Sequence, residues 1–295
     1  MSILKIIGDF NIRHANSRNA KTASRGINPV LDDKTDFLVR EAYNATRTNI
    51  IYSIGSEKGC KKIIITSASP HEGKTTTSLN VAITFAQTEA KVLVIDADLR
   101  KPRINRHLGL QREDGLSDLL CGLIDIDKAI KHSDKYNLDC ITSGHIPPNP
   151  TELLSSSEME NVLDKLGERY DYIFIDTPPV TVVTEAAAMA KYVSGVIFVV
   201  RQNSTIYESI NRARNSIQMA NAKILGYVLN DVSTTSYKYS GYNRYGGSKR
   251  GYGYGHKYGY GYGYGYGYGY GYGDNEQGKK QKPEKKKKSK KSQES

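Results

Sequence analysis

The chain has 295 residues and a formal net charge of +11, which is unevenly distributed. Residues 237–295 hold 14 Lys or Arg and 4 Asp or Glu, so that residues 1–236 carry a charge of only +1. Because the basic character belongs to the last segment, the globular part offers no general case for a nucleic-acid-binding face. The three cysteines show no Cys-x-x-Cys spacing. They indicate free thiols in a reducing compartment that are either buried or without a special role.

Two stretches bear on targeting and membrane insertion. The first residues lack the apolar core of a signal peptide. The longest apolar run, at 186–200, is interrupted by Lys191 and Ser194 and is too short to span a bilayer. We therefore expect a cytoplasmic protein.

Residues 1–35 are polar and mixed in character, and we expect a loosely ordered N-terminal segment there. Asp36 is placed to cap a helix that runs to about Tyr52. Within this helix Glu41, Asn44 and Arg47 recur three residues apart and share one shallow stripe. On pattern alone, a solvated face and a functional face both remain open for this stripe.

A predicted phosphate-binding loop follows. The β-branched run at 63–65 predicts a buried strand, and apolar residues at helical spacing predict a helix that opens at Lys74. This context suits a G-x-x-x-x-G-K-[ST] loop, from which only Ala68 departs. Backbone N–H groups would bind the β- and γ-phosphates, Lys74 would add a positive charge, and the Thr75 hydroxyl would bind Mg²⁺. We expect a nucleoside triphosphate here. The predicted nucleotide-binding residues of the loop are Ser69, Pro70, His71, Glu72, Gly73, Lys74, Thr75 and Thr76.

Two more apolar runs end in acids. The run at 91–95 is followed by Asp96 and Asp98, and the run at 172–175 by Asp176. In an open α/β sheet the ligand lies beyond the carboxyl ends of the strands, so these acids are predicted to converge on the loop. Asp176 would anchor the metal, and Asp96 or Asp98 would act near the γ-phosphate as base or as a second metal contact. Whether Arg100 offsets phosphate charge or pairs with a carboxylate stays open.

The remaining pattern alternates strands and helices, which predicts an α/β fold: a P-loop NTPase-like, mostly parallel sheet with helices on both faces. The further predicted strands are 138–142, 195–200 and 222–229, and the further predicted helices are two short ones within 115–131 and those at 151–168, 181–191 and 205–220. We expect one domain over residues 36–232, a tyrosine-rich tail over 233–273 and a lysine-rich tail over 274–295.

The segments around residues 68–76, 94–100 and 174–178 resemble the three Walker motifs of the bacterial tyrosine kinases. These are P-loop kinases of capsular and extracellular polysaccharide synthesis, and the chain is similar to their cytosolic, Gram-positive type. The resemblance covers about residues 36–232, and Asp96-x-Asp98-x-Arg100 is its most specific part. It implies an ATP-dependent protein-tyrosine kinase in which Lys74 and Thr75 bind phosphate and Mg²⁺. It further implies that Asp96 is the base and that Asp98 and Asp176 support the metal.

The same resemblance implies assembly with other chains. Members of the family carry a Glu-x-x-Arg-x-x-Arg oligomerisation motif, which reads Glu41, Asn44 and Arg47 here. Asn44 replaces an arginine, so we expect a homo-oligomer that is held through Glu41 and Arg47 and is weaker than in other members. A separate transmembrane chain-length regulator is implied as the activating partner, which would recruit the kinase to the inner face of the plasma membrane.

The C-terminal tail is expected to be disordered. Fourteen of the 22 tyrosines lie at or after Tyr237, most of them in a Gly-Tyr alternation that cannot pack a core. The resemblance implies that this tail is autophosphorylated, between subunits, and that other protein tyrosines are substrates. Nine lysines within 279–291 favour a solvated end or attraction to an anionic membrane surface, with nucleic acid a weaker option. The predicted phosphorylation sites are Tyr252, Tyr254, Tyr258, Tyr260, Tyr262, Tyr264, Tyr266, Tyr268, Tyr270 and Tyr272.

Two other functions would also use a phosphate loop in an α/β fold. A partition or division-site ATPase would carry an extra lysine where this chain has Ser69, and glycines in place of Pro70 and His71. An assembly scaffold with a purely structural nucleotide site would not need the full set of lysine, threonine and aspartates. The loop residues therefore argue against the partition ATPase, and the complete set of site residues argues against the scaffold. Both observations favour the kinase.

Overall fold

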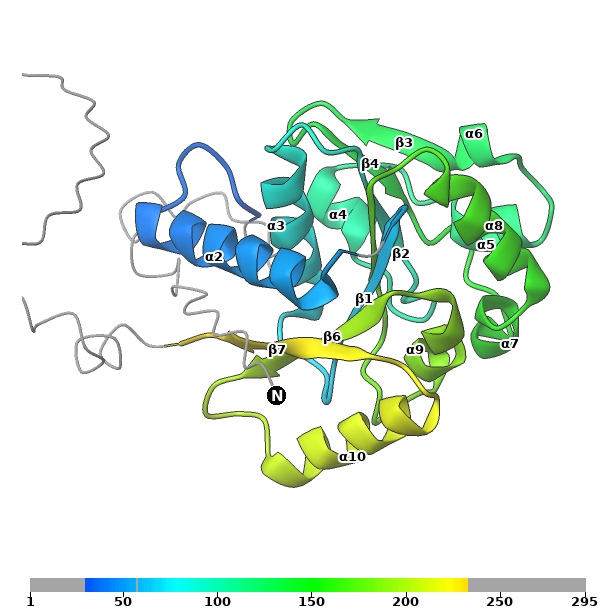
Figure 1. Cartoon of the computed structure of the whole chain (residues 1–295). Helices are drawn as coiled ribbons and strands as arrows, with labels where there is room; N and C mark the ends of the chain where they lie inside the picture. Colours follow the sequence, from blue (N-terminus) through cyan, green and yellow to red (C-terminus); the bar gives the residue numbers. More distant parts are fainter. Residues whose placement is uncertain (1–29, 57, 233–295) are drawn as a thin grey trace, which may run out of the picture. The chain divides into compact units, whose positions relative to one another are not determined.

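The computed structural model describes residues 30–56 and 58–232, all of which belong to the first of two units, Met1–Arg244 (Figure 1). The predicted tyrosine-rich and lysine-rich tails, and residues 1–29 of the predicted N-terminal segment, lie outside the described residues. Within the described ranges, no helix has both the length and the apolar character needed to cross a membrane.

A seven-stranded sheet forms the centre of the domain, in the order β3-β4-β2-β5-β1-β6-β7. Every neighbouring pair is parallel except the edge pair β3·β4, which is antiparallel. This confirms the predicted α/β class with a mostly parallel sheet. The strands are β1 (Lys61–Ser67), β2 (Val92–Asp96), β3 (Ile130–Ser133), β4 (Leu138–Ile141), β5 (Tyr172–Asp176), β6 (Gly195–Arg201) and β7 (Ile224–Asn230).

Helices cover both faces of the sheet, as predicted (Figure 1). The alternation along β1 shows how: Ile63 and Ile65 belong to one apolar core and Ile64 to the other. The first core also takes residues of α2 (Phe37–Ile54), α3 (Lys74–Ala86) and α4 (Ile104–Leu108). The second takes residues of α5 (Leu116–Leu120), α6 (Ile126–Ala129), α7 (Pro150–Leu154), α8 (Ser157–Gly167), α9 (Glu185–Ala188) and α10 (Tyr207–Met219), and a short 3₁₀ helix η1 (Ala190–Tyr192) follows α9.

The N-terminal end of the domain differs from the prediction. Asp36 caps α2 as expected, since its carboxylate accepts the backbone N–H of Leu38 at 2.8 Å. The expectation of a loosely ordered segment is wrong for residues 30–35, because Val30 and Leu31 are buried in the first core. The N–H of Leu31 also donates to Asn80 Oδ1 of α3 at 2.8 Å. Residues 30–35 therefore belong to the packed domain.

Three local details were not predicted. The helix expected at 151–168 is two helices, because the hydroxyl of Ser156 caps α8 and bonds back to the Leu153 carbonyl of α7. The edge strand β3 and the single-turn α4 are too short to produce a periodic pattern. Cys121 is exposed, whereas Cys140 is buried and Cys60 lies between these extremes.

Candidate nucleotide-binding and phosphoryl-transfer site

The loop between β1 and α3 has the backbone form that the phosphate-loop motif predicts. Gly73 directly precedes the helix with φ of 90°, a left-handed conformation that glycine adopts without steric cost. His71 also has a positive φ, of 65°. The first N–H groups of α3 have no partner within the helix, and the helix dipole adds positive charge at this end. Such a helix start can bind an anion. The predicted loop residues Ser69, Pro70, His71, Glu72 and Gly73 lead into it, and Thr76 lies in its first turn.

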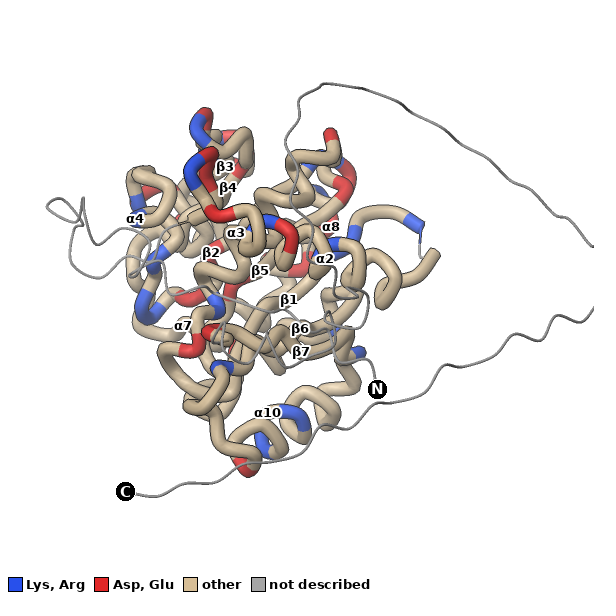
Figure 2. The backbone as a smooth tube through the Cα atoms, turned by 90° about the vertical axis from the view of Figure 1, so that its left-hand side faces the viewer, with Lys and Arg blue, Asp and Glu red and all other residues tan. Residues whose placement is uncertain are grey.

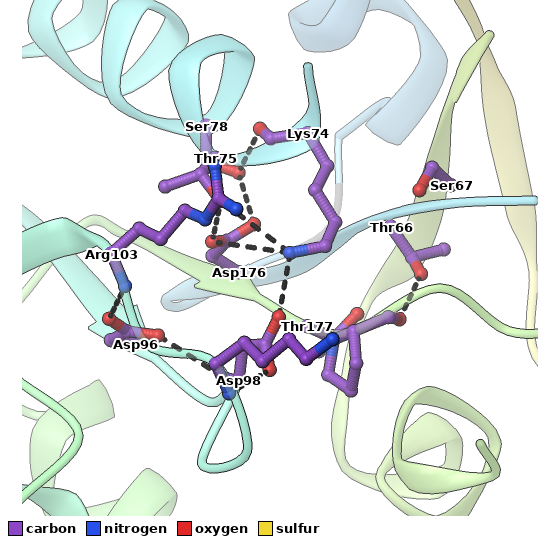
Figure 3. A network of polar contacts seen from close by, with 12 residues as sticks. Thr66, Ser67, Lys74, Thr75, Ser78, Asp96, Asp98, Arg103, Asp176 and Thr177 are labelled. Atoms are coloured by element: carbon purple, nitrogen blue, oxygen red, sulfur yellow. Dashed lines mark hydrogen bonds and ion pairs between the residues drawn. The ribbon is translucent and has the colours of Figure 1, made fainter. Parts of the chain in front are cut away.

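Thr75 and Ser78 of α3 hold the carboxylate at the tip of β5. The Thr75 hydroxyl donates to Asp176 Oδ2 at 2.6 Å, and the Ser78 hydroxyl donates to Oδ1 at 3.3 Å (Figure 3). All three residues are buried. Ser78 was missed in the sequence analysis, although it follows Thr75 by three residues and so shares its helix face.

Lys74 lies between two carboxylates. Its Nζ is 2.9 Å from Asp98 Oδ2 and 3.9 Å from Asp176 Oδ2 (Figure 3). Burial alone would lower the pKa of Lys74, but the charges of Asp176 and Asp98 outweigh it and raise the pKa, so the side chain is a cation. Burial raises the pKa of Asp176 against the lowering effects of Lys74 and Thr75. The structure thus brings together the predicted residues Lys74, Thr75, Asp98 and Asp176.

Asp96 stands beside Asp176 in the sheet register but faces a different set of partners. Its carboxylate accepts the backbone N–H groups of Asp98 at 3.3 Å, Arg103 at 3.1 Å and Ile104 at 3.0 Å. Burial, with the charge of Asp176, raises the pKa of Asp96 to about 7. A carboxylate with a pKa near neutrality suits a general base. In this structure, however, Asp96 organises the turn that presents Asp98 to Lys74.

Arg100, left open by the sequence, pairs with a carboxylate. Its Nε donates to Glu185 Oε1 at 2.8 Å, and Glu185, at the start of α9, is only 1% exposed. The second carboxylate oxygen, Oε2, has no hydrogen-bond partner among the described residues. Nothing in the sequence around Glu185 indicates burial, because an acid before an alanine run is a common start of a solvated helix.

Contacts behind the phosphate loop, which the sequence analysis did not predict, support this loop. Glu72 accepts the backbone N–H of Ser69 at 3.0 Å and a hydrogen bond from the Thr205 hydroxyl. The side-chain amide of Asn230, at the end of β7, donates to the backbone carbonyl of Glu72 at 2.9 Å. Arg201, at the end of β6, donates to the carbonyl of His71 at 3.4 Å. The carboxyl ends of β6 and β7 therefore brace the loop from the side opposite β5.

The oxygen donors at the strand ends fit a magnesium ion of the phosphate-loop type. No group of three or more His, Cys, Asp or Glu side chains poised for a metal occurs in residues 30–56 and 58–232. Mg²⁺ in nucleotide sites, however, takes only one or two protein oxygens and completes its shell with phosphate oxygens and water. The Thr75 hydroxyl beside Asp176 supplies such hard oxygens, with Asp98 on the other side of Lys74.

The predicted oligomerisation residues lie on α2. Glu41 is exposed and accepts from the side-chain amide of Asn44 at 3.0 Å. Arg47 turns inwards, and its Nη1 donates to the backbone carbonyl of Thr84 in α3. Glu41 is thus on the surface, whereas Arg47 has a partner within the domain.

Comparison with known proteins agrees with this site. Residues 60–224 match the family model AAA_31, described as an AAA domain. The tyrosine-protein kinase YwqD of Bacillus subtilis (strain 168) is 37% identical over 206 residues, which cover 70% of this chain and 86% of the relative. The tyrosine-protein kinase etk of Escherichia coli (strain K12) is 35% identical over 212 residues, which cover 71% of this chain but only 29% of that longer protein.

Solved structures give the same result. The kinase domain of Escherichia coli tyrosine kinase ETK superposes with a TM-score of 0.72 at 29% identity, over 86% of this chain and 95% of that one. The chimerical protein CapA2B2 superposes with a TM-score of 0.64 at 34% identity, over 68% of this chain and 88% of that one. The P-loop fold, the convergent strand ends and these relatives together show that the chain belongs to the bacterial tyrosine-kinase family.

Proposed function

We propose that this chain is an ATP-dependent protein-tyrosine kinase that phosphorylates tyrosines of its own C-terminal segment. The observation that carries the proposal is the meeting of Lys74 and Thr75 with Asp98 and Asp176 at the carboxyl ends of β1, β2 and β5. A phosphate loop alone would serve many nucleotide-binding proteins. Membership of the bacterial tyrosine-kinase family and the Gly-Tyr repeat support tyrosine as the acceptor of the phosphoryl group.

The reaction is an in-line transfer of the γ-phosphoryl group. The phenolic oxygen forms a bond to the γ-phosphorus, the bond from that phosphorus to the bridging oxygen breaks, and ADP leaves. The start of α3 and Lys74 bind the phosphates, and the phenolic proton passes to the carboxylate of either Asp96 or Asp98. Mg²⁺, bound by Thr75 and Asp176 with support from Asp98, would neutralise charge on the phosphate oxygens. The residues of the chain thus contribute by positioning the two substrates and by offsetting the negative charge of the phosphates.

The acceptors are the tyrosines of the Gly-Tyr segment, from Tyr252 to Tyr272, and transfer takes place between subunits. The glycine content allows a mean reach of roughly 30 Å for about 30 residues. The oligomer that presents one chain's tyrosines to another forms through α2. Exposed Glu41 and the exposed apolar side chains of Phe37 and Leu38 support this assignment.

We place this kinase in the control of capsular or extracellular polysaccharide synthesis and chain length. Its activating partner would be a transmembrane chain-length regulator, which recruits the kinase to the inner face of the plasma membrane. The nine lysines of residues 279–291 would add attraction to an anionic surface.

Phosphotyrosine mapping tests the function. The full chain is incubated with Mg-ATP and the cytoplasmic segment of its partner, and modified tyrosines are located by mass spectrometry. We expect phosphotyrosine within residues 237–273 and none in the Lys74→Met variant. An unmodified tail in the presence of the activating segment would overturn the proposal.

Mixing two variants tests transfer between subunits. The Lys74→Met chain keeps its tyrosines but lacks the phosphate-binding lysine, and a chain without residues 237–273 keeps the site but lacks the acceptors. We expect the mixture to phosphorylate the Lys74→Met tail. If each variant alone and the mixture all remain unmodified while the unaltered chain is phosphorylated, transfer takes place within one chain.

A further inference from the structure

A cleft of about 540 Å³ lies next to the nucleotide site and has a strongly cationic lining. Its walls come from the segment after β2, from α4 with the loop that follows it, and from Ile146 in the loop before α7. Lys and Arg positions gather on this side of the molecule near α4 in Figure 2. The cationic lining residues are Arg100, Lys101, Arg103, Arg106 and Arg112, and Glu113 is the acid beside them.

Most of this positive charge is uncompensated. In the described ranges 30–56 and 58–232, no ion pair involves Lys101, Arg103 or Arg106, and all three residues are exposed. Among the described residues Arg100 pairs with Glu185 through its Nε alone, which leaves the terminal N–H groups of its guanidinium available. Arg112 pairs with Glu113 at 3.7 Å, and its buried Nε has no hydrogen-bond partner among the described residues. Such a concentration of one sign of charge in a concave surface attracts an anion.

The cleft and the catalytic acids share one piece of backbone. Asp96 accepts the N–H groups of Arg103 and Ile104, so the turn that presents Asp98 to Lys74 also carries Arg100 and Arg103 to the cleft. An anion that is produced at Lys74 and Asp98 therefore arises beside these arginines. The phosphorylated product of the reaction is therefore the first candidate for the anion that the cleft binds.

The lining also contains apolar surface. Leu110 contributes to the wall, and Ile146 is 57% exposed there. A free phosphate or a sugar phosphate would gain nothing from these side chains. An aromatic ring that bears a phosphate would contact Ile146 with its ring and the arginines with its phosphate, in charge-assisted hydrogen bonds.

We propose that this cleft is a phosphotyrosine-binding site for segments with the Gly-Tyr sequence of residues 251–273. The proposal rests on the proposed kinase function and adds a site for its product. Unphosphorylated, residues 251–273 hold one lysine and no acid, so the cleft repels this segment weakly. Each phosphotyrosine adds a charge of about −1.5 to −2 and reverses that interaction. Phosphorylation thus creates the ligand of the cleft.

Product binding at this place favours successive phosphorylation of one segment. Neighbouring tyrosines of the repeat are two residues apart, and two residues span at most about 7 Å. A phosphotyrosine in the cleft keeps the next hydroxyls close to Asp98. Chains with several phosphates would then accumulate, and chains with a single phosphate would remain rare.

Peptide binding to the full, dephosphorylated chain tests the site, with saturating Mg-ADP present to occupy the nucleotide site. The probes are fluorescent peptides with the sequence of residues 258–272, either unphosphorylated or phosphorylated at Tyr264 and Tyr266. We expect the phosphopeptide to bind at least about tenfold more tightly, with an affinity that falls as salt rises. The double variant Lys101→Gln/Arg106→Gln should lose about tenfold in affinity for it.

The matched control is Lys165→Gln/Arg212→Gln, which removes the same two residue types from α8 and α10. We expect it to bind the phosphopeptide within about twofold of the unaltered chain. Equal binding of the two peptides, or unchanged binding by the Lys101/Arg106 variant, would overturn the proposal. Competition by inorganic phosphate or ATP at the concentration of the phosphopeptide would show a general anion site and would also overturn it. The phosphates of the peptide are introduced by chemical synthesis, so the binding experiment does not depend on kinase activity. A failure of peptide binding can therefore be distinguished from a failure of the proposed kinase function.

Discussion

The Nζ atom of Lys74 lies 2.9 Å from Asp98 Oδ2, so a carboxylate of the site holds the cation that is expected to bind phosphate. A phosphate oxygen must compete with Asp98 for this ammonium group. The same carboxylate lies where the acceptor hydroxyl and the metal are expected. We therefore expect Asp98 to oppose nucleotide binding without metal and to support the transfer.

This relationship predicts opposite effects of Asp98→Asn on binding and on transfer. Loss of the charge frees Lys74, so ATP without Mg²⁺ should bind more tightly in calorimetric titration. Tyrosine phosphorylation should fall by about 10²-fold or more, because an acid at the reacting centre is lost. The control is Asp33→Asn, at an exposed position ahead of α2. Weaker binding of metal-free ATP by Asp98→Asn would contradict this reading of the ion pair.

The Arg100–Glu185 pair predicts a rescue. Arg100→Ala leaves a buried carboxylate with no partner on either oxygen, and we expect the free energy of unfolding to fall by about 1–3 kcal/mol. Since Arg100 itself is 46% exposed, its own loss of packing is small. Adding Glu185→Gln removes the buried charge and should restore part of the stability. Chemical denaturation of the single and double variants measures this, and equal instability of the two would contradict the pairing.

Asn230 predicts a link between the end of β7 and the phosphate loop. Its amide donates to the Glu72 carbonyl at 2.9 Å in a buried position. Asn230→Ala should lower the free energy of unfolding by about 1–2 kcal/mol and weaken nucleotide binding, because the loop loses its brace. Asn161→Ala, on the exposed side of α8, is the matched control. If Asn230→Ala loses stability but binds Mg-ADP like the unaltered chain, the residue supports the fold alone.

Asp118 predicts a dependence of stability on pH. Burial opposes its ionisation, but the N–H of Gly115 and the side chain and N–H of His145 donate to its carboxylate and lower the pKa. A lowered pKa stabilises the folded chain above the pKa of an unfolded aspartate, about 3.9, and this contribution is lost as the pH falls through the folded-state pKa.

The comparison variant for this prediction is Asp118→Asn, which cannot ionise. We expect the unaltered chain to be more stable than the variant at pH 6–7 and the difference to shrink as the pH falls below about 3.9, the pKa of an unfolded aspartate. Urea unfolding at a series of pH values measures the difference. A difference that stays constant over this range would show that ionisation of Asp118 does not contribute.

The sequence predicted those parts of the molecule that repeat or that follow a strict local motif. The apolar runs of β1, β2 and β5 each end in a polar group, and the rule that parallel strands end at one edge was enough to bring Lys74, Asp98 and Asp176 together. The capping of α2 by Asp36 is a local hydrogen bond with a strong residue preference. These features need no information about distant contacts.

The features that were missed depend on contacts between distant segments. Arg100 meets Glu185, 85 residues away, and Asn230 meets Glu72, 158 residues away. No local pattern marks either pair. Asp96 was correctly placed at a strand end, but its capture by the N–H groups of Arg103 and Ile104 depends on the path of the following turn. The sequence therefore predicted where the site lies more fully than how its groups are oriented.

Calorimetric titration of the full chain with Mg-ADP tests most directly whether these strand ends form one nucleotide site. The account predicts one site per chain, loss of binding by at least about tenfold in Lys74→Met, and a similar loss in Asp176→Asn, since each removes a charge next to the phosphates or the metal. Binding by both variants at the affinity of the unaltered chain would contradict it, because the nucleotide would then lie elsewhere.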